Sequence, residues 1–167
     1  MARRNAPASP GPGDGKMRIL YPIHEGPQQT FMESSAEEVL YGGAAGGGKS
    51  YALRALGVSY CLEHAGATVV LFRRTFRELE DTHIRMLHLE VPSYVATYKS
   101  STHDFIFPNG SILMLRFCEK EDDVYSYDTF EADMELFDEL TAFSEFQYVY
   151  LMTRCRSTKP WWPGRKI

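Results

Sequence analysis

The sequence contains few cysteines, no long apolar run and no strong excess of charge of either sign. Its three cysteines, Cys61, Cys118 and Cys155, are widely spaced and odd in number, which argues against a disulfide framework and against a zinc site. No stretch reaches the apolar length of a membrane span, and the first residues lack the apolar segment of a signal peptide. We therefore expect a protein of a reducing compartment that is neither secreted nor embedded in a membrane.

The chain of 167 residues is 44% hydrophobic and 24% charged, a composition that predicts one globular domain with its own core. Residues 1–17 are rich in proline, glycine and alanine and show no apolar periodicity, so we expect a disordered tail ahead of a domain at residues 18–167. The net charge of −4 neither favours nor excludes a DNA partner, because a DNA-translocating enzyme can hold DNA with only a few basic side chains.

A glycine-rich stretch, VLYGGAAGGGKSY at residues 39–51, is the most informative part of the sequence. Residues 43–50 match G-x-x-x-x-G-K-[ST], the phosphate-binding P-loop. Glycines let backbone N–H groups turn toward phosphate oxygens, and the start of the following helix adds unpaired N–H donors. Lys49 is expected to reach the β- and γ-phosphates, and the Ser50 hydroxyl to bind Mg²⁺. The predicted nucleotide-binding residues here are Gly43, Ala44, Ala45, Gly46, Gly47, Gly48, Lys49, Ser50 and Tyr51.

Apolar patterns predict the elements around this loop. Residues 39–41 form a short apolar run that we interpret as a strand, residues 49–64 are typical of a helix, and residues 68–72 are typical of a strand buried on both faces. Strand, helix and strand in this order predict a βαβ unit of a parallel sheet. A helix is expected at residues 76–90, and Pro108-Asn109-Gly110 between two apolar runs predicts an antiparallel hairpin.

Two carboxylates follow a further apolar stretch at residues 134–137. Asp138 is suited to holding Mg²⁺ through water, and the adjacent Glu139 is suited to orienting and deprotonating an attacking water. Arg73 and Arg74 are expected at the carboxyl end of the 68–72 strand, on the side where ligands bind in open α/β sheets. With the glycine-rich loop, these residues predict a nucleotide-hydrolysing site.

Three pairs of polar residues outside these motifs have more than one interpretation or predict a local structure. Gln28 or Gln29 is able to read the edge of an adenine base, since an amide both donates and accepts, but either is equally suited to the exposed start of a short helix. His83 and His88 share one predicted helix, yet their spacing does not place them on one face and no zinc motif surrounds them, so we expect them to be structural or exposed. Ser144, with Gln147 three residues later, predicts the capped start of a last helix.

Several segments follow one another in a specific order: Gln28-Gln29-x-Phe31, YGGAAGGGKS, VVLFRRTFREL, the FPNGS hairpin, EKEDDVYSYDTFEADMELFDELTAF and the terminal RCRS. Together they resemble the ATPase domain of the large terminase subunit of tailed bacteriophages. The resemblance covers nearly everything from residue 18 to residue 167. It implies an α/β fold of the RecA-like (ASCE) class of P-loop NTPases, with a mostly parallel sheet flanked by helices and an inserted antiparallel hairpin.

The resemblance also implies an activity and partners. It suggests a motor, driven by hydrolysis of ATP with Mg²⁺, that packages double-stranded viral DNA in the cytoplasm of an infected bacterial host. The implied partners are the DNA, the portal protein and the small terminase subunit, with a homo-oligomeric ring in the full-length motor and no membrane. Roles carry over to matching positions: an adenine contact to Gln28 or Gln29, phosphate and Mg²⁺ binding to Lys49 and Ser50, the Walker B acid to Asp138 and the catalytic base to Glu139.

The sequence departs from the family in two places. Some terminases carry a basic residue inside the loop, where this chain has Ala44 and Ala45, so a phosphate-stabilising arginine is expected from Arg73, from Arg74 or from a neighbouring subunit. Family members also continue with a strand that couples hydrolysis to movement and with a nuclease domain. The resemblance therefore predicts a truncated ATPase domain with an incomplete sheet.

Two other hypotheses fit parts of the pattern. A RecA-like helicase or DNA-repair ATPase would share the glutamine, the glycine-rich loop and the Asp-Glu pair, although the FPNGS hairpin and the EDDVYSY stretch favour a terminase. A truncated chain would alternatively be a nucleotide-binding remnant without activity. Stimulation by single-stranded DNA alone would favour the helicase, and nucleotide binding without turnover would favour the remnant.

Overall fold

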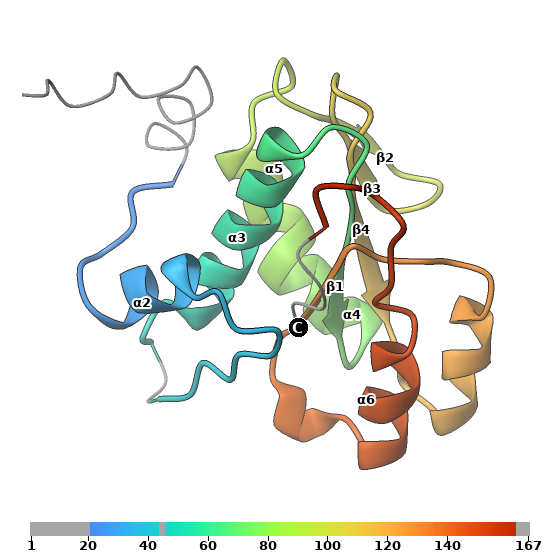
Figure 1. The fold of residues 1–167 in the computed structure, drawn as a ribbon. Coiled ribbons are helices and arrows are strands. Elements are labelled where there is room, and N and C mark those ends of the chain that lie inside the picture. Colours follow the sequence, from blue (N-terminus) through green and yellow to red (C-terminus); the bar gives the residue numbers. More distant parts are fainter. Residues whose placement is uncertain (1–20, 44–45, 163–167) are drawn as a thin grey trace, which may run out of the picture.

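The computed structural model describes residues 21–43 and 46–162 of the chain. In these residues a five-stranded sheet is covered by helices on both faces (Figure 1). The tail expected at residues 1–17 lies outside the described residues, as do Ala44 and Ala45. No helix in the described part of the chain is long and apolar enough to cross a membrane. All three cysteines are buried thiols.

The sheet is mixed, with the strand order β2-β3-β4-β1-β5. Central strand β1 pairs in parallel with β4 on one side and with β5 on the other. The pairs β2–β3 and β3–β4 are antiparallel, so the parallel part of the sheet consists of β4, β1 and β5. The strands are β1 (Thr68–Arg73), β2 (Thr97–Lys99), β3 (Asp104–Ile106), β4 (Ile112–Phe117) and β5 (Met134–Phe137).

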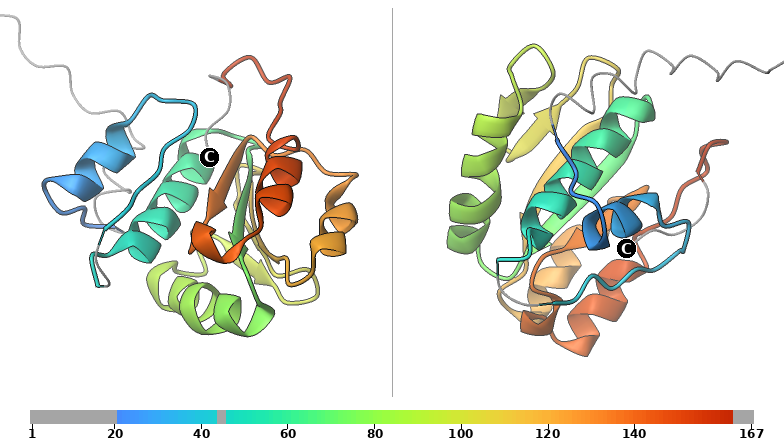
Figure 2. Two further views of the ribbon diagram at one scale, coloured as in Figure 1. Left: turned by 90° about the horizontal axis from the view of Figure 1, so that it is seen from below. Right: turned by 90° about the vertical axis from the view of Figure 1, so that its left-hand side faces the viewer.

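The helical elements lie in two layers, one on each face of the sheet (Figure 2). The α2, α3, α4, η1 and α5 elements belong to one layer, and η2 and α6 to the other. Their bounds are α2 (Pro27–Glu33), α3 (Lys49–Glu63), α4 (Phe76–Leu79), the π-helical η1 (Glu80–Ile84), α5 (Arg85–Glu90), the 3₁₀-helical η2 (Glu121–Tyr127) and η3 (Leu140–Ala142), and α6 (Glu145–Met152).

Strand β1 divides the core in two because its successive side chains point to opposite faces. Val69 and Leu71 join the larger cluster with α3 and α5, whereas Val70 and Phe72 join the smaller cluster beneath η2 and α6. All four side chains are fully buried, and each contributes about 1.5–3 kcal/mol by leaving water. The prediction of a strand buried on both faces is confirmed, and the site described below lies at the end of this strand.

The hairpin is also confirmed, because β3 and β4 pair antiparallel around Pro108-Asn109-Gly110. Its turn is fastened to the carboxyl end of α3, where the Asn109 amide and the Ser111 hydroxyl both donate to the carbonyl oxygen of Cys61. The sequence did not predict β2, a strand of three residues without a clear apolar alternation. The helix expected at 76–90 is present and ends before Pro92, but its middle turn, η1, is π-helical.

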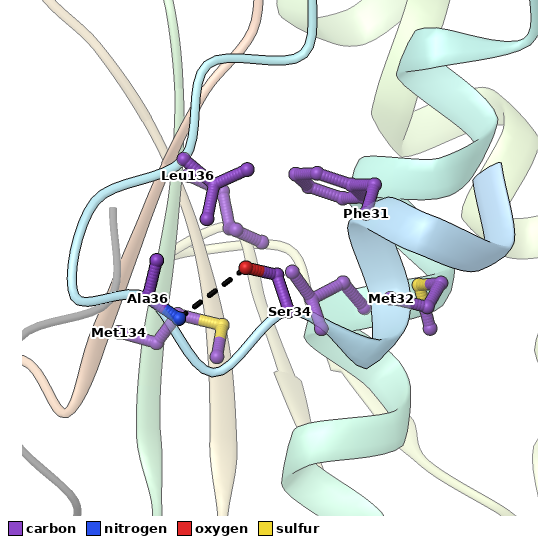
Figure 3. Close-up of a pocket in the computed structure, with 8 residues that line it drawn as sticks. Phe31, Met32, Ser34, Ala36, Met134 and Leu136 are labelled. Atoms are coloured by element: carbon purple, nitrogen blue, oxygen red, sulfur yellow. Dashed lines mark hydrogen bonds between the residues drawn. The ribbon is translucent and has the colours of Figure 1, made fainter. Parts of the chain in front are cut away.

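The strand expected at residues 39–41 is not formed, and this prediction was wrong. These residues have no regular structure, and the Leu40 side chain is 81% exposed. Both edges of β1 are already paired, so the segment has no place beside the central strand. Side chains of α2, of the segment at residues 34–39 and of β5, among them Phe31, Val39 and Leu136, line a pocket instead (Figure 3). The predicted βαβ unit therefore has only its helix and its second strand.

Candidate functional site: a buried carboxylate beside a glycine-rich loop

Asp138 directly follows β5 and lies at the carboxyl end of the two parallel strands. Its backbone N–H donates to the carbonyl oxygen of Phe72 at 3.0 Å, which continues the ladder between β1 and β5 by one step. Because parallel strands end at the same edge, Arg73 at the end of β1 lies next to it, and its Nη1 donates to Asp138 Oδ2 at 2.8 Å. The Asp138 residue is only 3% exposed.

Two more side chains donate to this carboxylate. The Ser50 hydroxyl, at the start of α3, lies 3.1 Å from Oδ1 and 3.0 Å from Oδ2. The His83 Nε2 in η1 lies 2.9 Å from Oδ2. Asp138 therefore connects the glycine-rich loop, the end of β1 and the π-helical turn. Ser50, Arg73 and Asp138, which the sequence predicted to share one site, are in contact.

The electrostatics keep Asp138 ionised although it is buried. Burial alone would raise its pKa, but the hydrogen bond from His83, the positive charge of Arg73 and the Ser50 hydroxyl outweigh burial and hold the pKa below its usual range. Burial acts in the opposite sense on His83 and lowers its pKa, so that the imidazole is neutral at pH 7. The pair is therefore a carboxylate that accepts a hydrogen bond from a neutral imidazole.

His83 was missed by the sequence analysis as a member of the site. It is fully buried, and its partner Asp138 is 55 residues away in the chain. The ring is buried, as expected of a structural histidine, but it also contacts the carboxylate most central to the site. Local sequence offered no signal for this contact, since a π-helical turn shifts the faces that a regular helix would present.

Glu139 occupies a backbone conformation that few residues other than glycine adopt. Its φ is 56° and its ψ is 55°, in the left-handed region. This bend separates the two neighbouring carboxylates, since Asp138 is buried whereas the Glu139 side chain is 54% exposed. Glu139 Oε1 lies 4.0 Å from Arg73 Nη1. Both carboxylates line one open pocket with Lys49 and Gly43.

The glycine-rich loop leads directly into α3. Gly48 has a φ of 70° and caps the helix, which begins at Lys49. The Lys49 ammonium donates to the carbonyl oxygen of Gly43 at 3.0 Å, across the loop. The Tyr41 hydroxyl donates to the carbonyl oxygen of Gly47 at 3.3 Å, and the Tyr51 hydroxyl donates to that of Pro22 at 3.2 Å.

The two candidate glutamines differ in their contacts. Gln28 is 6% exposed, its Oε1 accepts from the backbone N–H of His24 at 3.1 Å, and its Nε2 donates to the carbonyl oxygen of Gly48 at 3.3 Å. Gln29 is exposed and bonds Glu33 within its own helix. Only Gln28 of the two lines the pocket beside Gly46, Gly47 and Gly48. Gln28 therefore contacts the loop at Gly48, whereas the side-chain hydrogen bond of Gln29 stays within α2.

The two candidate arginines also point in different directions. Arg73 contacts Asp138, and its Nε lies 3.7 Å from Glu78 Oε2. The Nη1 of Arg74 donates to Gln147 Oε1 at 2.8 Å and to the carbonyl oxygen of Cys118, beneath α6. The structure therefore brings Arg73, and not Arg74, to the carboxylate.

The oxygen atoms of Ser50 and Asp138 are the donor set that this site offers to a metal ion. Both are hard ligands of the kind that Mg²⁺ prefers. Within residues 21–43 and 46–162, no three histidine, cysteine, aspartate or glutamate side chains cluster closely enough to hold a metal by themselves. Ser50 and Asp138 supply one or two oxygens of the kind that commonly hold Mg²⁺ together with phosphate oxygens of a nucleotide.

Comparison with known proteins identifies the family. A family model described as terminase large subunit, T4likevirus-type, N-terminal, matches residues 40–166. The chain belongs to this family. The match contains Lys49, Ser50, His83, Asp138 and Glu139, whereas α2 with Gln28 precedes it. No curated protein and no solved structure matches the chain.

Proposed function

We propose that this chain is the ATP-binding and ATP-hydrolysing motor domain of a terminase large subunit that packages viral DNA. The observation that carries the proposal is the contact of Ser50, at the end of the glycine-rich loop, with Asp138, 88 residues later. This contact supports the proposal, because the Ser50 hydroxyl and the Asp138 carboxylate could then hold one Mg²⁺ ion beside the phosphates of a bound nucleotide.

Nucleotide binding is supported by the loop and by the helix behind it. The α3 helix has 15 residues and begins at Lys49, so its first N–H groups and its positive dipole end face the loop. Gly48 in the left-handed conformation turns the backbone into the helix. We propose that ATP lies across the two pockets that flank the loop, with its phosphates near Lys49 and Ser50 and its base toward Gln28.

Magnesium would be held by the Ser50 hydroxyl and, through water, by Asp138. When bound, the ion neutralises charge on the phosphate oxygens and orients them for attack. Asp138 is already ionised and oriented by Arg73 and His83, so it is ready to accept such an ion.

The remaining roles follow from position and exposure. Glu139 is an exposed carboxylate on the pocket that Lys49 also lines, and we assign it the orientation and deprotonation of the attacking water. Lys49 stabilises negative charge on the phosphates. Arg73 is the candidate for a phosphate-stabilising arginine in this chain, whereas Arg74 is held elsewhere by Gln147 and Cys118.

The larger biological role rests on the family. We propose double-stranded DNA, the portal protein and the small terminase subunit as partners, a homo-oligomeric ring in the full-length motor, a RecA-like (ASCE) architecture, and action in the host cytoplasm. The parallel pairing of β1 with β5 and the position of the loop at the carboxyl ends of these strands support the architecture.

The test is the rate of phosphate release from ATP with Mg²⁺. Lys49→Ala and Glu139→Gln should each lower turnover by about 10³-fold or more, and Glu139→Gln should retain ATP binding because it removes only the base. Glu145→Gln, an exposed change at the start of α6, is the matched control and should be neutral. Unchanged turnover in both site variants would overturn the proposal, whereas binding without turnover in the unmodified chain would indicate an inactive nucleotide-binding remnant.

A further inference from the structure

We infer that His83 is a positioning residue whose Nε2–H group fixes the orientation of Asp138, so that carboxylate oxygen Oδ1 and the Ser50 hydroxyl face the metal that accompanies the nucleotide. The inference rests on the proposed function and concerns a residue outside its assigned machinery. Metal-binding carboxylates commonly need such outer hydrogen bonds to keep one oxygen directed at the ion.

The two carboxylate oxygens of Asp138 have unequal surroundings. Oδ2 accepts from Arg73 at 2.8 Å, from His83 at 2.9 Å and from Ser50 at 3.0 Å. Among the described residues, Oδ1 accepts only from Ser50, at 3.1 Å. One oxygen is therefore anchored, and the other keeps lone pairs directed toward the loop side.

His83 and Arg73 are not equivalent anchors. Arg73 lies within 4.0 Å of Glu139 and within 3.7 Å of Glu78, as well as near Asp138. Its guanidinium group can therefore move away from Asp138 and still pair with another carboxylate. The His83 ring is fully buried, and Asp138 is its hydrogen-bond partner. If Arg73 turns toward a phosphate, as the proposed function has it, His83 still holds Asp138 in place.

The surrounding contacts hold His83 at this position. It lies in the π-helical turn η1, and Arg54 of α3 donates from Nη1 to the carbonyl oxygen of Thr82 at 3.1 Å. Arg54 is itself fixed by a two-bond pair with Glu90, at 2.7 and 2.8 Å. Buried arginine pairs of this kind have little freedom, so the turn is fastened to the same helix that carries Ser50.

The second nitrogen of His83 makes no hydrogen bond with the described residues, so Asp138 is the polar partner that the ring has there. Nδ1 is buried and has no hydrogen-bond partner among the described residues. An unpaired buried polar atom costs about 1–3 kcal/mol, so a side chain that only filled space here would be better apolar. Since an ionised carboxylate only accepts, the ring must carry a proton on Nε2 to make the 2.9 Å hydrogen bond to Asp138.

The experiment compares the affinity for ADP with Mg²⁺ and with EDTA, measured by titration calorimetry on the full chain. His83→Phe keeps a ring without a donor, and His83→Gln restores an N–H at a similar reach. The matched control is His88→Phe in the same helical segment, where the exposed ring contacts Tyr98 and Phe105 and not Asp138.

The inference predicts that His83→Phe lowers the gain in affinity from Mg²⁺ by about tenfold or more while the affinity in EDTA changes less than about twofold. His83→Gln should recover most of the gain, and His88→Phe should retain all of it. A full Mg²⁺ gain in His83→Phe would overturn the inference alone. Failure of the unmodified chain to bind ADP would overturn the proposed function instead.

A measurement on the unmodified chain remains decisive if the variants fold poorly. Long-range ¹⁵N–¹H correlation spectra of the imidazole distinguish the two neutral tautomers. The inference predicts the Nε2–H form for His83 in the chain without nucleotide. The Nδ1–H form would contradict it, because Nε2 would then have no proton to donate to Asp138.

Discussion

The two halves of the candidate site are built in different ways. On the sheet side, Asp138 is buried and receives hydrogen bonds from a serine, an arginine and a histidine. On the loop side, the described glycines between residues 42 and 48 are exposed or half-buried, and the Lys49 ammonium donates to a carbonyl oxygen of the loop. The position of the carboxylate is thus fixed by packing, whereas the loop offers backbone groups to solvent.

Under the proposed function, the fixed carboxylate would hold the metal ion and the open loop would bind the phosphates. A buried carboxylate that binds a metal must stay charged, and donors fixed by the fold keep it so. A phosphate-binding loop must instead leave its N–H groups unoccupied for the ligand. We expect substitutions on the sheet side to lower stability strongly, and substitutions on the loop side to act mainly on binding.

The largest effect on stability is expected for Asp138→Ala. The change leaves the Arg73 charge and the His83 donor buried without their acceptor, which should lower the free energy of unfolding by about 4 kcal/mol. Urea denaturation measures this loss. Asp128→Ala, which removes an exposed carboxylate bonded to Tyr150, is the control and should cost less than about 1 kcal/mol. Equal losses of stability in the two variants would show that the hydrogen bonds around Asp138 do not stabilise the fold more than an exposed contact does.

Two leucines, one on the sheet side and one beside the loop, test the expected difference in stability with uncharged side chains. Leu136 in β5 is 2% exposed, and Leu136→Ala should cost about 3 kcal/mol through lost burial and a cavity. Leu40, where the sequence favoured a strand, is 81% exposed, and Leu40→Ala should change stability by less than about 0.5 kcal/mol. A large loss at Leu40 would mean that residues 39–41 are packed as a strand after all.

Substitutions at two glycines of the loop distinguish the cost of backbone strain from the cost of a steric clash. Gly46 and Gly48 both have positive φ, at 82° and 70°, so alanine is strained at either position. Only at Gly48 would a Cβ meet a neighbour, the Gln28 amide at 2.2 Å. Gly48→Ala should therefore cost about 2 kcal/mol against about 1 kcal/mol for Gly46→Ala.

A third variant completes this test. Adding Gln28→Ala to Gly48→Ala removes the clash and should reduce the extra cost of the alanine to that at Gly46. If the two changes are simply additive in urea denaturation, Gln28 does not hold the loop in the way the contact with Gly48 indicates.

The last expected effect on stability is a gain. Glu139→Gly should raise the free energy of unfolding by about 0.5–1 kcal/mol, because glycine adopts a φ of 56° without the strain of a side chain. The same variant should lose ATP turnover if Glu139 is the base. A stability loss in thermal unfolding would show that the glutamate side chain contributes to the fold and not only to the site.

Much of the fold could be predicted because its signals are local. The apolar run at 68–72, the turn at Pro108-Asn109-Gly110 and the capping box of Ser144 and Gln147 each determine a nearby element, and each is present. Strand β2 escaped prediction because three residues carry too little pattern. The strand at 39–41 was predicted from local apolarity, but a strand also needs a partner edge beside it, and the position of the segment relative to the sheet is not a local property.

The site residues likewise fall into those that local sequence could predict and those that it could not. Ser50, Arg73 and Asp138 could be placed together because motif spacing and strand ends determine their side of the sheet. The choice between Arg73 and Arg74 could not be made, since it depends on Gln147 in a distant helix. His83 could not be found because its contact needs a π-helical turn and a partner far along the chain.

The central claim, that the glycine-rich loop and Asp138 form one nucleotide and metal site, is tested most directly by thermal unfolding with ADP. With Mg²⁺ and ADP at about 100 times the dissociation constant, the melting temperature of the unmodified chain should rise by about 5–10 °C. The rise should be smaller in EDTA and absent in Lys49→Ala. No rise in the unmodified chain at millimolar ADP and Mg²⁺, or an equal rise in Lys49→Ala, would contradict the account.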